Sequence, residues 1–350
     1  MASILNGLGD AFTHTIIPLN GNRGAAARLD PHVAVEFLRA PSGRGGLLYP
    51  VALRRIVVSA KPDLLVTYNW GAIDAVLGCM IASPCPMVHN ECGFGPDEAT
   101  SFKQRRVWTR GVALQRVFCT IVVSRVLYDV ARSRFGLPED KLRFIQTGVD
   151  TGRFTPGRNP GMRREWGAGD ETVVFGFAGG LRGEKNLHLL LEAFREAAMP
   201  VDARLLLFGD GPDRADLERL AQHLGIRERV LFAGHAADIS QVMPSFDVFV
   251  MSSRTEQTPN ALLEAMACGL PVIATDVGDC LALVGAAGAP FIVDPNDQVA
   301  YAAAMRRLAE NAELRQTLGA ANRSRAVAAF SKSRMIQEYG DVYNAAIARR

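Results

Sequence analysis

The sequence predicts an α/β protein built from two doubly wound domains, each with a parallel sheet flanked by helices. Three observations lead to this prediction. The chain has 350 residues, which is long for one hydrophobic core and ordinary for two domains. Short apolar runs alternate with longer helix-like segments along the whole chain, as in parallel sheets whose crossovers are helices. With 48% hydrophobic and 21% charged residues, the composition is that of a packed protein.

Six short apolar runs in the first half are typical of strands. They are HTIIPL (14–19), VAVEFL (33–38), DLLVTY (63–68), PMVHNE (86–91), CTIVVS (119–124) and LRFIQT (142–147), with helices expected over 47–60 and 125–135. A ligand-binding domain of this type usually opens with a strand and a Gly-rich turn before its first helix. This chain begins in the helix-like SILNGLGDAF. We therefore expect the first domain to lack its first strand, either because Met1 is internal or because the domain is trimmed.

The second half repeats this plan. The expected strands are TVVFGFAG (172–179), ARLLLFG (203–209), RVLFAG (229–234), DVFVMS (247–252), LPVIATD (270–276) and PFIV (290–293), and the expected helices are 186–198, 212–224, 259–268 and 298–309. The turn-rich stretch TGVDTGRFTPGRNPG (147–161) is the expected linker. We therefore place the two domains at residues 1–150 and 151–330.

Charge and cysteine usage exclude several classes of protein. The net charge of +3 is too small to indicate nucleic-acid binding, although residues 1–150 hold 17 Lys and Arg against 12 Asp and Glu. The six cysteines form no CxxC pair and follow no metal-ligand spacing, so we expect neither a disulfide nor a bound metal. Neither an apolar run of membrane-spanning length nor a secretory signal is present, which predicts a cytoplasmic protein.

Two carboxylates in the apolar stretch TEQTPNALLEAMACGLPVIATD (255–276) are the first candidate binding residues. Glu256 follows a strand, and open parallel sheets bind ligands at the carboxyl ends of their strands. Glu264 lies in the middle of a helix that is apolar nearly all round, where an unpaired charge is costly. We expect the vicinal hydroxyls of a ribose to satisfy Glu264, the alternative being a distant Arg or backbone amides.

Two helix starts in this half suit phosphate groups. The helix that carries Glu264 is expected to begin at Pro259, with Thr258 as its cap and Gly269 as its C′ residue. Its first N–H groups would favour a phosphate. The turn GLRGEKN places Arg182 and Lys185 at the start of another helix, which suits a diphosphate. The turn in LLLFGDGPDR (205–214) is a third site of this kind.

Five spaced motifs resemble the retaining glycosyltransferases of family 4, which have the two-domain GT-B fold. The motifs are EQTPNALLE with its E-x7-E spacing, GGLRGEKN, FGDGP, VLFAG and GVDTGRF. The resemblance covers residues 141–345 nearly throughout and the first 140 residues loosely. It implies two Rossmann-like domains facing a central cleft. It also implies transfer of a hexose-type sugar from a nucleotide-sugar, with retention and without a metal or cofactor.

The resemblance also implies a role for each site residue. Lys185 would hold the donor diphosphate, Glu264 the ribose hydroxyls, and Glu256 the donor sugar. With Arg182, the residues Lys185 and Glu256 are the expected catalytic set. The further donor-binding positions are Gly180, Gln257, Thr258, Pro259, Asn260, Leu263, Phe232 and His235. Segment 331–350 resembles the terminal helix that crosses back to the first domain.

The chain departs from the family pattern at three places. Gly180 stands where the family usually has Arg, and we expect Arg182 to replace that Arg across the turn. Cys92 stands where the family commonly has His, and His89 lies nearby, on the opposite face unless the strand ends between them. Both are candidate contacts to the donor sugar. With the missing first strand, these departures leave open a catalytically impaired nucleotide-sugar-binding pseudoenzyme. A nucleotide-sugar epimerase is a third hypothesis, against which the E-x7-E spacing argues.

The basic first domain is expected to handle the acceptor, which is a sugar or a lipid-linked sugar. In KQRRVWTRGVALQR (103–116), Lys103, Arg106 and Arg110 lie close to one helical face, beside Trp108. This pattern is typical of a helix on an anionic membrane surface, and the alternative is a solvated face above a core-facing stripe. The resemblance places the protein in surface-polysaccharide or glycolipid assembly, in the cytoplasm or peripherally on the inner face of the membrane.

Overall fold

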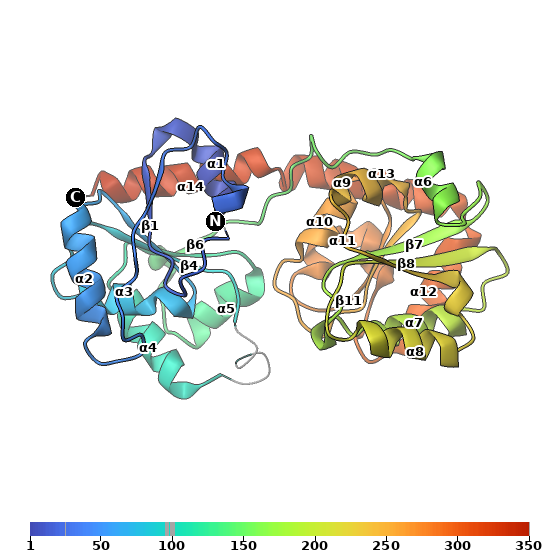
Figure 1. Cartoon of the computed structure of the whole chain (residues 1–350), viewed down its shortest axis with the longest axis horizontal. Helices are drawn as coiled ribbons and strands as arrows, with labels where there is room; N and C mark the ends of the chain where they lie inside the picture. Colours follow the sequence, from blue (N-terminus) through green and yellow to red (C-terminus); the bar gives the residue numbers. More distant parts are fainter. Residues whose placement is uncertain (25, 95–97, 99–101, 350) are drawn as a thin grey trace. The chain divides into compact units, whose positions relative to one another are not determined.

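A computed structural model of the chain describes residues 1–24, 26–94, 98 and 102–349. The chain divides into two compact units (Figure 1). Unit 1 consists of residues 1–146 and 333–350, and unit 2 consists of residues 147–332. In each unit, helices cover a parallel sheet, as the sequence predicts.

Unit 1 contains a four-stranded parallel sheet and a separate pair of parallel strands. The sheet has the order β3-β4-β5-β6, with β3 Leu65–Tyr68, β4 Met87–Glu91, β5 Cys119–Val122 and β6 Leu142–Phe144. The pair joins β1 His14–Ile16 to β2 Val35–Phe37. The first element is the helix α1 Ala2–Leu8, so the expected helical start is confirmed.

Five further helices cover the unit 1 sheet. They are α2 Tyr49–Ala60, α3 Ile73–Cys79, α4 Gln104–Leu114, α5 Arg125–Ser133 and α14 Lys332–Ile347. The last of these, α14, returns to unit 1, where Tyr339 and Tyr343 pack in one cluster with Ile4 of α1 and Val88 and Ile121 of the sheet. Residue 350, at the end of the segment expected to cross back, lies outside the described residues.

The helix α4 buries cations that the sequence analysis placed on a solvent-facing or membrane-facing side. Arg110 is 1% exposed, and its Nε lies 3.1 Å from Oε2 of Glu91 while its Nη2 lies 3.2 Å from Glu98. Arg106 also pairs with Glu98, at 3.0 Å. The expectation of an open basic face is therefore wrong for Arg110. Two buried carboxylates hold its guanidinium inside, because a charge leaves water only where a partner compensates it.

Unit 2 contains a six-stranded parallel sheet in the order β12-β11-β10-β7-β8-β9. Its strands are β7 Val173–Ala178, β8 Ala203–Phe208, β9 Val230–Gly234, β10 Val248–Met251, β11 Val272–Thr275 and β12 Ile292–Val293. The helices are α6 Pro160–Glu165, α7 Leu187–Glu196, α8 Arg214–His223, α9 Ile239–Val242, α10 Asn260–Ala267, α11 Cys280–Gly288, α12 Gln298–Glu310 and α13 Ala312–Ala329.

Apolar clusters fill both faces of the unit 2 sheet. Along β10, Val248 and Val250 belong to the cluster under α7, α8 and α12, whereas Phe249 and Met251 belong to the cluster under α10 and α11 (Figure 1). Successive side chains of a strand point to opposite faces, so a strand covered on both sides must be apolar throughout. This is why the strands of unit 2 are continuous apolar runs and could be located from the sequence.

Candidate functional site

The unit 2 sheet has a topological switch point between β7 and β10. The chain runs outward from β7 through β8 to β9 and then places β10 on the other side of β7. Open parallel sheets bind ligands outside the carboxyl ends of the strands at such a point. The loop after β7 carries Arg182 and Lys185, and the loop after β10 carries Glu256. The switch point therefore brings together the two loops that hold the predicted catalytic residues.

An ion pair joins these two loops. Nζ of Lys185 lies 2.5 Å from Oε1 of Glu256. The Ser253 hydroxyl donates to the same carboxylate oxygen at 2.8 Å, and the Ser252 hydroxyl donates to the Lys185 carbonyl at 2.9 Å. The side chains of Lys185 and Glu256 are 24% and 14% exposed, so the pair is fixed by its neighbours and still accessible to a ligand. The sequence analysis did not single out Ser252 or Ser253.

Two glycines let the loops of this sheet edge approach closely. Gly209, at φ 138°, follows β8, and a Cβ atom there would overlap the Gly179 carbonyl in the loop after β7. Gly278, at φ 56°, follows β11, and a Cβ atom there would lie 2.6 Å from the Glu256 carbonyl oxygen. Only glycine combines these φ angles with the missing side chain. Gly209 of the FGDGP motif is therefore a packing element of this sheet edge, and a phosphate site at its turn stays a prediction.

Arg182 lies beside Gly180, where the family pattern would have an arginine. A Cβ atom on Gly180 would lie 3.2 Å from Nε of Arg182, so the Arg182 side chain extends back over the glycine. Its guanidinium is 64% exposed and lies 4.0 Å from the Glu184 carboxylate. This position agrees with the prediction that Arg182 replaces the family's arginine, and its role stays a prediction.

The helix α10 starts one residue later than expected. Pro259 is the N-cap residue and the helix begins at Asn260, one residue after the expected start, and the Thr258 cap stays a prediction. A proline at the N-cap offers no side-chain acceptor to the first N–H groups of the helix. Gly269 has φ 74° and is the C′ residue, as expected. The sequence therefore located the helix well but misplaced its first turn by one residue.

The Glu264 carboxylate in the middle of α10 has no hydrogen bond or ion pair to any residue that the structure describes. Its neighbours Leu263 and Ala265 are fully buried, and the side chain of Glu264 itself is half-buried. Burial raises the pKa of Glu264 above its ordinary value of 4.5, and the charge of Arg153 opposes that rise. Arg153 is bound elsewhere, with its Nη2 2.8 Å from Oδ1 of Asp238. The alternative that an arginine pairs Glu264 is therefore not what the structure shows.

The strand β9 and the loop after it carry the predicted base-binding residues Phe232 and His235. The Phe232 side chain is 7% exposed and belongs to the core, and its carbonyl accepts a hydrogen bond from Arg214 at 3.0 Å. His235 follows the strand and is exposed. The Phe232 side chain is therefore committed to packing. The contact between a base and the backbone near His235 stays a prediction.

The two predicted sugar-contact residues of unit 1 have different surroundings. His89 is fully buried, with its Nδ1 2.8 Å from the Thr67 hydroxyl and its Nε2 3.8 Å from Glu91. Cys92 lies just after the end of β4 and is exposed, and its N–H donates to the Asn69 side chain at 2.7 Å. The structure therefore gives His89 a place in the core of unit 1 and leaves Cys92 open to solvent.

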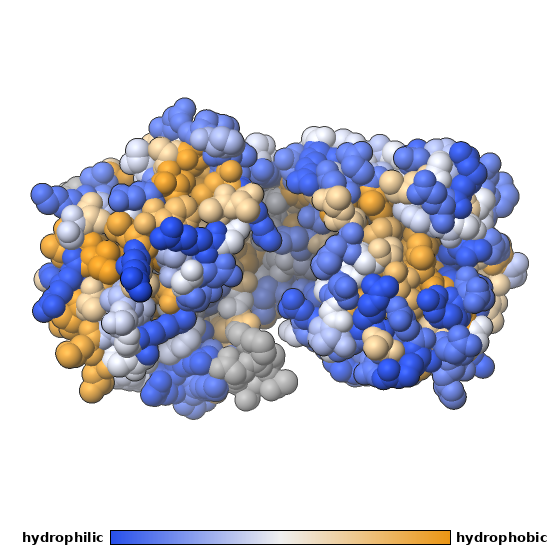
Figure 2. Space-filling view, in the orientation of Figure 1, coloured by the Kyte–Doolittle hydropathy of each residue, from blue (hydrophilic) through white to orange (hydrophobic). Residues whose placement is uncertain are grey.

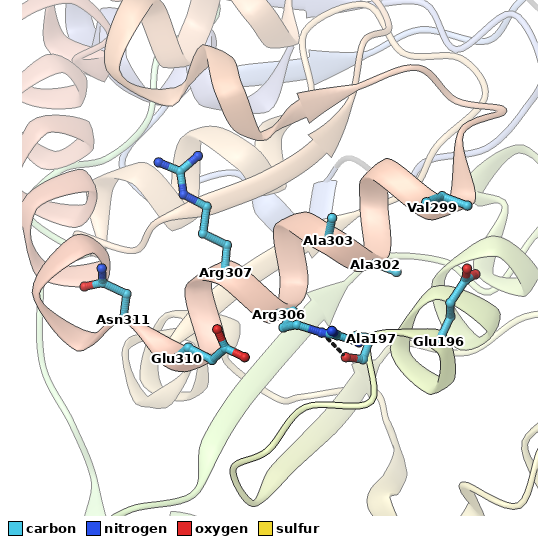
Figure 3. A pocket seen from close by; sticks show the side chains of 9 residues that line it. All are labelled: Glu196, Ala197, Val299, Ala302, Ala303, Arg306, Arg307, Glu310 and Asn311. Atoms are coloured by element: carbon cyan, nitrogen blue, oxygen red, sulfur yellow. Dashed lines mark hydrogen bonds between the residues drawn. The ribbon is translucent and has the colours of Figure 1, made fainter.

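A separate pocket of about 500 Å³ lies along α12 of unit 2 (Figure 3). Val299, Ala303 and Arg306 of α12 line it together with Glu196 at the end of α7. Arg306 donates to the Ala197 carbonyl at 2.6 Å. The pocket lies at the C-terminal end of α7, whereas Lys185 precedes the N-terminal end of the same helix. It is therefore not part of the switch-point site.

The described part of the chain contains neither a metal-binding cluster nor a membrane-spanning helix. Among the residues outside 25, 95–97, 99–101 and 350, no group of three His, Cys, Asp or Glu side chains is arranged to hold a metal ion. In the same part of the chain, no helix combines the length and the apolar composition that crossing a membrane requires.

Two family models match the chain. A model described as glycosyl transferases group 1 matches residues 159–325, within unit 2. A model described as glycosyltransferase family 4 matches residues 3–153, which include all four strands of the unit 1 sheet. Together they account for most of the sequence.

Individual relatives share a low sequence identity with this chain. The N-acetyl-alpha-D-glucosaminyl L-malate synthase of Bacillus anthracis is 28% identical over 182 residues, 52% of this chain and 48% of that protein, so the chain spans about half of this relative's length. The UDP-Gal:alpha-D-GlcNAc-diphosphoundecaprenol alpha-1,3-galactosyltransferase of Escherichia coli is 25% identical over 304 residues, 84% of this chain and 78% of that protein. The structure of Anabaena HepE in complex with UDP and glucose aligns with a TM-score of 0.82 and 22% identity, over 98% of this chain and 94% of that chain. The last likeness confirms the predicted fold.

The unpaired carboxylate of Glu264 predicts that the stability of the ligand-free protein depends on pH. The pKa of Glu264 is raised in the folded state, so the folded protein binds this proton more tightly than the unfolded chain does. The contribution of Glu264 to stability is therefore largest below pH 4.5 and is lost as the pH rises through the folded-state pKa. We expect Glu264→Gln, which cannot ionise, to raise the melting temperature of the ligand-free protein at neutral pH. Thermal unfolding of both proteins over a pH series measures this difference, which should shrink as the pH falls. A variant that is less stable at neutral pH would show that Glu264 has a partner in the folded protein.

Proposed function

The chain belongs to family 4 of the glycosyltransferases, which have the GT-B fold, and on this basis we propose that it is a retaining, metal-independent glycosyltransferase. It moves a hexose-type sugar from a nucleotide-sugar to an acceptor. The observation that carries the proposal is the contact of Lys185 with Glu256 at the switch point, followed directly along the chain by α10 with its ionisable, half-buried and unpaired Glu264. A cation for a diphosphate and a carboxylate for vicinal hydroxyls are the groups that a nucleotide-sugar requires.

Each of these residues has a defined task in the proposed binding mode. Lys185 holds the diphosphate with Arg182 beside it, and the first N–H groups of α10 add further donors. Glu264 accepts hydrogen bonds from the ribose. When the diphosphate takes the charge of Lys185, the Glu256 carboxylate is free to accept from a hydroxyl of the donor sugar. The residues Gly180, Gln257, Thr258, Pro259, Asn260, Leu263 and His235 form the remaining wall of the donor site in this proposal.

The same residues account for catalysis. Cleavage of the bond between sugar and diphosphate builds negative charge on the leaving group. Cations and N–H groups that are already oriented hold that charge more strongly in the transition state than in the bound donor, which lowers the barrier. Lys185 is oriented before the donor arrives, because Glu256 fixes its side chain and Ser252 fixes its carbonyl. The acceptor attacks from the face that the diphosphate leaves, so the anomeric configuration is retained.

The comparisons support a choice of donors and acceptors to test. The structure of the Anabaena protein is a complex with UDP. The name of the Escherichia coli relative specifies a UDP-sugar as its donor and a lipid-linked sugar as its acceptor. We propose a UDP-hexose as the donor, unit 1 as the acceptor-binding part, and a sugar or a lipid-linked sugar as the acceptor. Surface-polysaccharide or glycolipid assembly in the cytoplasm is the corresponding setting. Cys92 remains a candidate contact to the donor sugar.

A membrane-borne acceptor agrees with the exposed apolar residues of unit 1. On one side of α4, Arg105, Trp108 and Val112 are exposed, with Trp108 at 69%. Hydrophobic surface also gathers near α2, where Leu47 is 98% exposed, and Ile81 after α3 is 95% exposed (Figure 2). Exposed apolar side chains beside cations are typical of a protein that rests on an anionic lipid surface. We therefore propose peripheral membrane contact through these residues in place of Arg110.

Loss of the Glu256 carboxylate should abolish transfer and leave donor binding largely intact. We expect Glu256→Gln to lower the turnover number by about 100-fold or more, because the carboxylate orients both the sugar and Lys185. Thermal-shift screening of UDP-, GDP- and ADP-sugars identifies the donor, and release of the nucleoside diphosphate then reports turnover. Glu313→Gln, an exposed position on α13, is the matched control and should behave as the wild type. Wild-type protein that binds a donor and never turns it over would support the pseudoenzyme hypothesis instead.

Membrane contact can be measured by flotation with vesicles. We expect the full chain to float with vesicles that contain anionic lipid and to release from them at high salt, since part of the attraction is electrostatic. The double variant Leu47→Ala, Trp108→Ala should float less, while Leu281→Ala, which removes an exposed leucine of unit 2, should float like the wild type. Protein that remains wholly in solution at low salt would remove the membrane proposal and leave the donor site untouched.

A further inference from the structure

Ser253 lies just after β10 and is completely buried beside the ion pair of the switch point. Its relative exposure is 0%, and its hydroxyl donates to Oε1 of Glu256 at 2.8 Å. Nζ of Lys185 contacts the same oxygen at 2.5 Å. Two donors therefore share Oε1, whereas Oε2 of Glu256 has no hydrogen-bond partner among the residues that the structure describes.

The backbone around Ser253 is held from both neighbouring strands. The hydroxyl of Thr275, the last residue of β11, donates to the Ser253 carbonyl at 2.6 Å, and Thr275 is also fully buried. On the other side, the Arg254 N–H donates to the Glu184 carbonyl, in the loop after β7, at 2.8 Å. The position of Ser253 is thus fixed by contacts that do not involve the Glu256 carboxylate.

The backbone of Glu256 is packed as well. Gly278, after β11, leaves room for the Glu256 carbonyl, and the Asp279 N–H donates to the Gln257 carbonyl at 2.9 Å. The freedom that remains in Glu256 is therefore that of its side chain, which rotates about several bonds between the backbone and the carboxylate. A hydrogen bond to the carboxylate is needed to select one of these rotamers.

The two donors to Glu256 differ in what a ligand can do to them. Lys185 is 24% exposed, and in the proposed binding mode its charge is taken by the diphosphate of the donor. Ser253 is fully buried, so a ligand does not reach its hydroxyl. The Glu256 side chain is only 14% exposed and still requires a donor when Lys185 has left it. Among the described residues, the Ser253 hydroxyl is the donor that remains.

We infer that Ser253 is a positioning residue for the transfer reaction: its hydroxyl keeps Oε1 of Glu256 in place once Lys185 binds the diphosphate, so that Oε2 receives a hydroxyl of the donor sugar. The inference rests on the proposed function, because Glu256 meets a sugar only if the chain binds a nucleotide-sugar. A hydrogen bond from a hydroxyl to a carboxylate is charge-assisted and stronger than a neutral one. A carboxylate that is oriented in this way contributes to the reaction of the sugar rather than to affinity for the nucleotide.

The inference predicts a loss of turnover without a loss of nucleotide affinity. We expect Ser253→Ala to lower the turnover number by about tenfold, the effect of one lost hydrogen bond to a charged group. The dissociation constant for UDP should change by less than about twofold, because UDP has no sugar for Glu256 to contact. Release of UDP from the UDP-hexose that thermal-shift screening selects measures turnover, and isothermal titration with UDP measures affinity.

Three further variants test whether the lost turnover follows from this hydrogen bond. Ser253→Cys keeps the size of the side chain but donates weakly, so its turnover number should fall between those of the wild type and Ser253→Ala. Thr275→Val removes the hydroxyl that holds the Ser253 carbonyl and should have a smaller effect than Ser253→Ala. Ser245→Ala removes a serine hydroxyl that is 1% exposed and precedes β10, so it is the matched control and should turn over as the wild type does.

A double-mutant cycle shows whether Ser253 acts through Glu256. In that case Ser253→Ala should change the residual turnover little in a Glu256→Ala background. Wild-type turnover in Ser253→Ala, or losses that multiply in the double variant, would overturn the inference. Equal loss of turnover and of UDP affinity in Ser253→Ala would also overturn it, since that pattern indicates a structural role.

Failure of the proposed function gives different results. Full turnover in Glu256→Ala would remove the assigned role of Glu256, and absence of turnover in the wild type would contradict the proposed function and the inference with it. Melting temperatures check that each variant is folded. Ser253→Cys keeps the inference testable if Ser253→Ala does not fold.

Discussion

A carboxylate that is partly buried without a partner raises the free energy of a folded protein, and Glu264 is such a group. Its pKa is raised by burial, and no described residue donates a hydrogen bond to it. A sequence that needed only a stable α10 would have an apolar residue or a paired charge at this position. A glutamate at position 264 is therefore best explained by a ligand that supplies hydrogen-bond donors to its carboxylate. The unpaired carboxylate lowers the stability of the ligand-free protein. Hydrogen bonds from a bound ligand to that carboxylate then contribute to the binding free energy.

Sheet topology brings together the other two main residues of the proposed donor site, Lys185 and Glu256. Neighbouring strands β7 and β10 end at the switch point, so their loops meet without any long-range feature in the sequence. The contact between Lys185 and Glu256 holds both side chains in place before a ligand binds. It orients a cation for a diphosphate and a carboxylate for a sugar, and it lowers the reorganisation that binding requires. Beyond this pair, Arg323 of α13 donates to the Ala267 carbonyl and so fastens the C-terminal end of α10, the helix that carries Glu264.

Much of this arrangement could be predicted from the sequence. All six expected strands of each half were located, most of them because strands buried on both faces are continuous apolar runs. The exceptions include β1 and β2, whose middle residues are exposed. Lys185, Glu256 and Glu264 stand out by type and spacing. Helix α11 was missed because it is short and apolar, and Gly285 interrupts it. Arg110 was misjudged because its partners lie 19 and 12 residues away, and helical periodicity cannot show a charge pair that only tertiary packing creates. The pair of Arg153 and Asp238, separated by 85 residues, was invisible for the same reason, although Arg153 lies inside the quoted motif GVDTGRF.

The proposed donor site depends most on the ribose hydroxyls of the nucleotide as the missing partners of Glu264. Affinity measured by calorimetry for UDP and for 2′,3′-dideoxy-UDP, in the wild type and in Glu264→Gln, tests this directly. We predict that removing the hydroxyls weakens binding to the wild type by about tenfold or more and leaves the weaker binding to the variant unchanged. Equal affinity of the wild type for both nucleotides would contradict the account, because the carboxylate would then be charged and buried for some other reason.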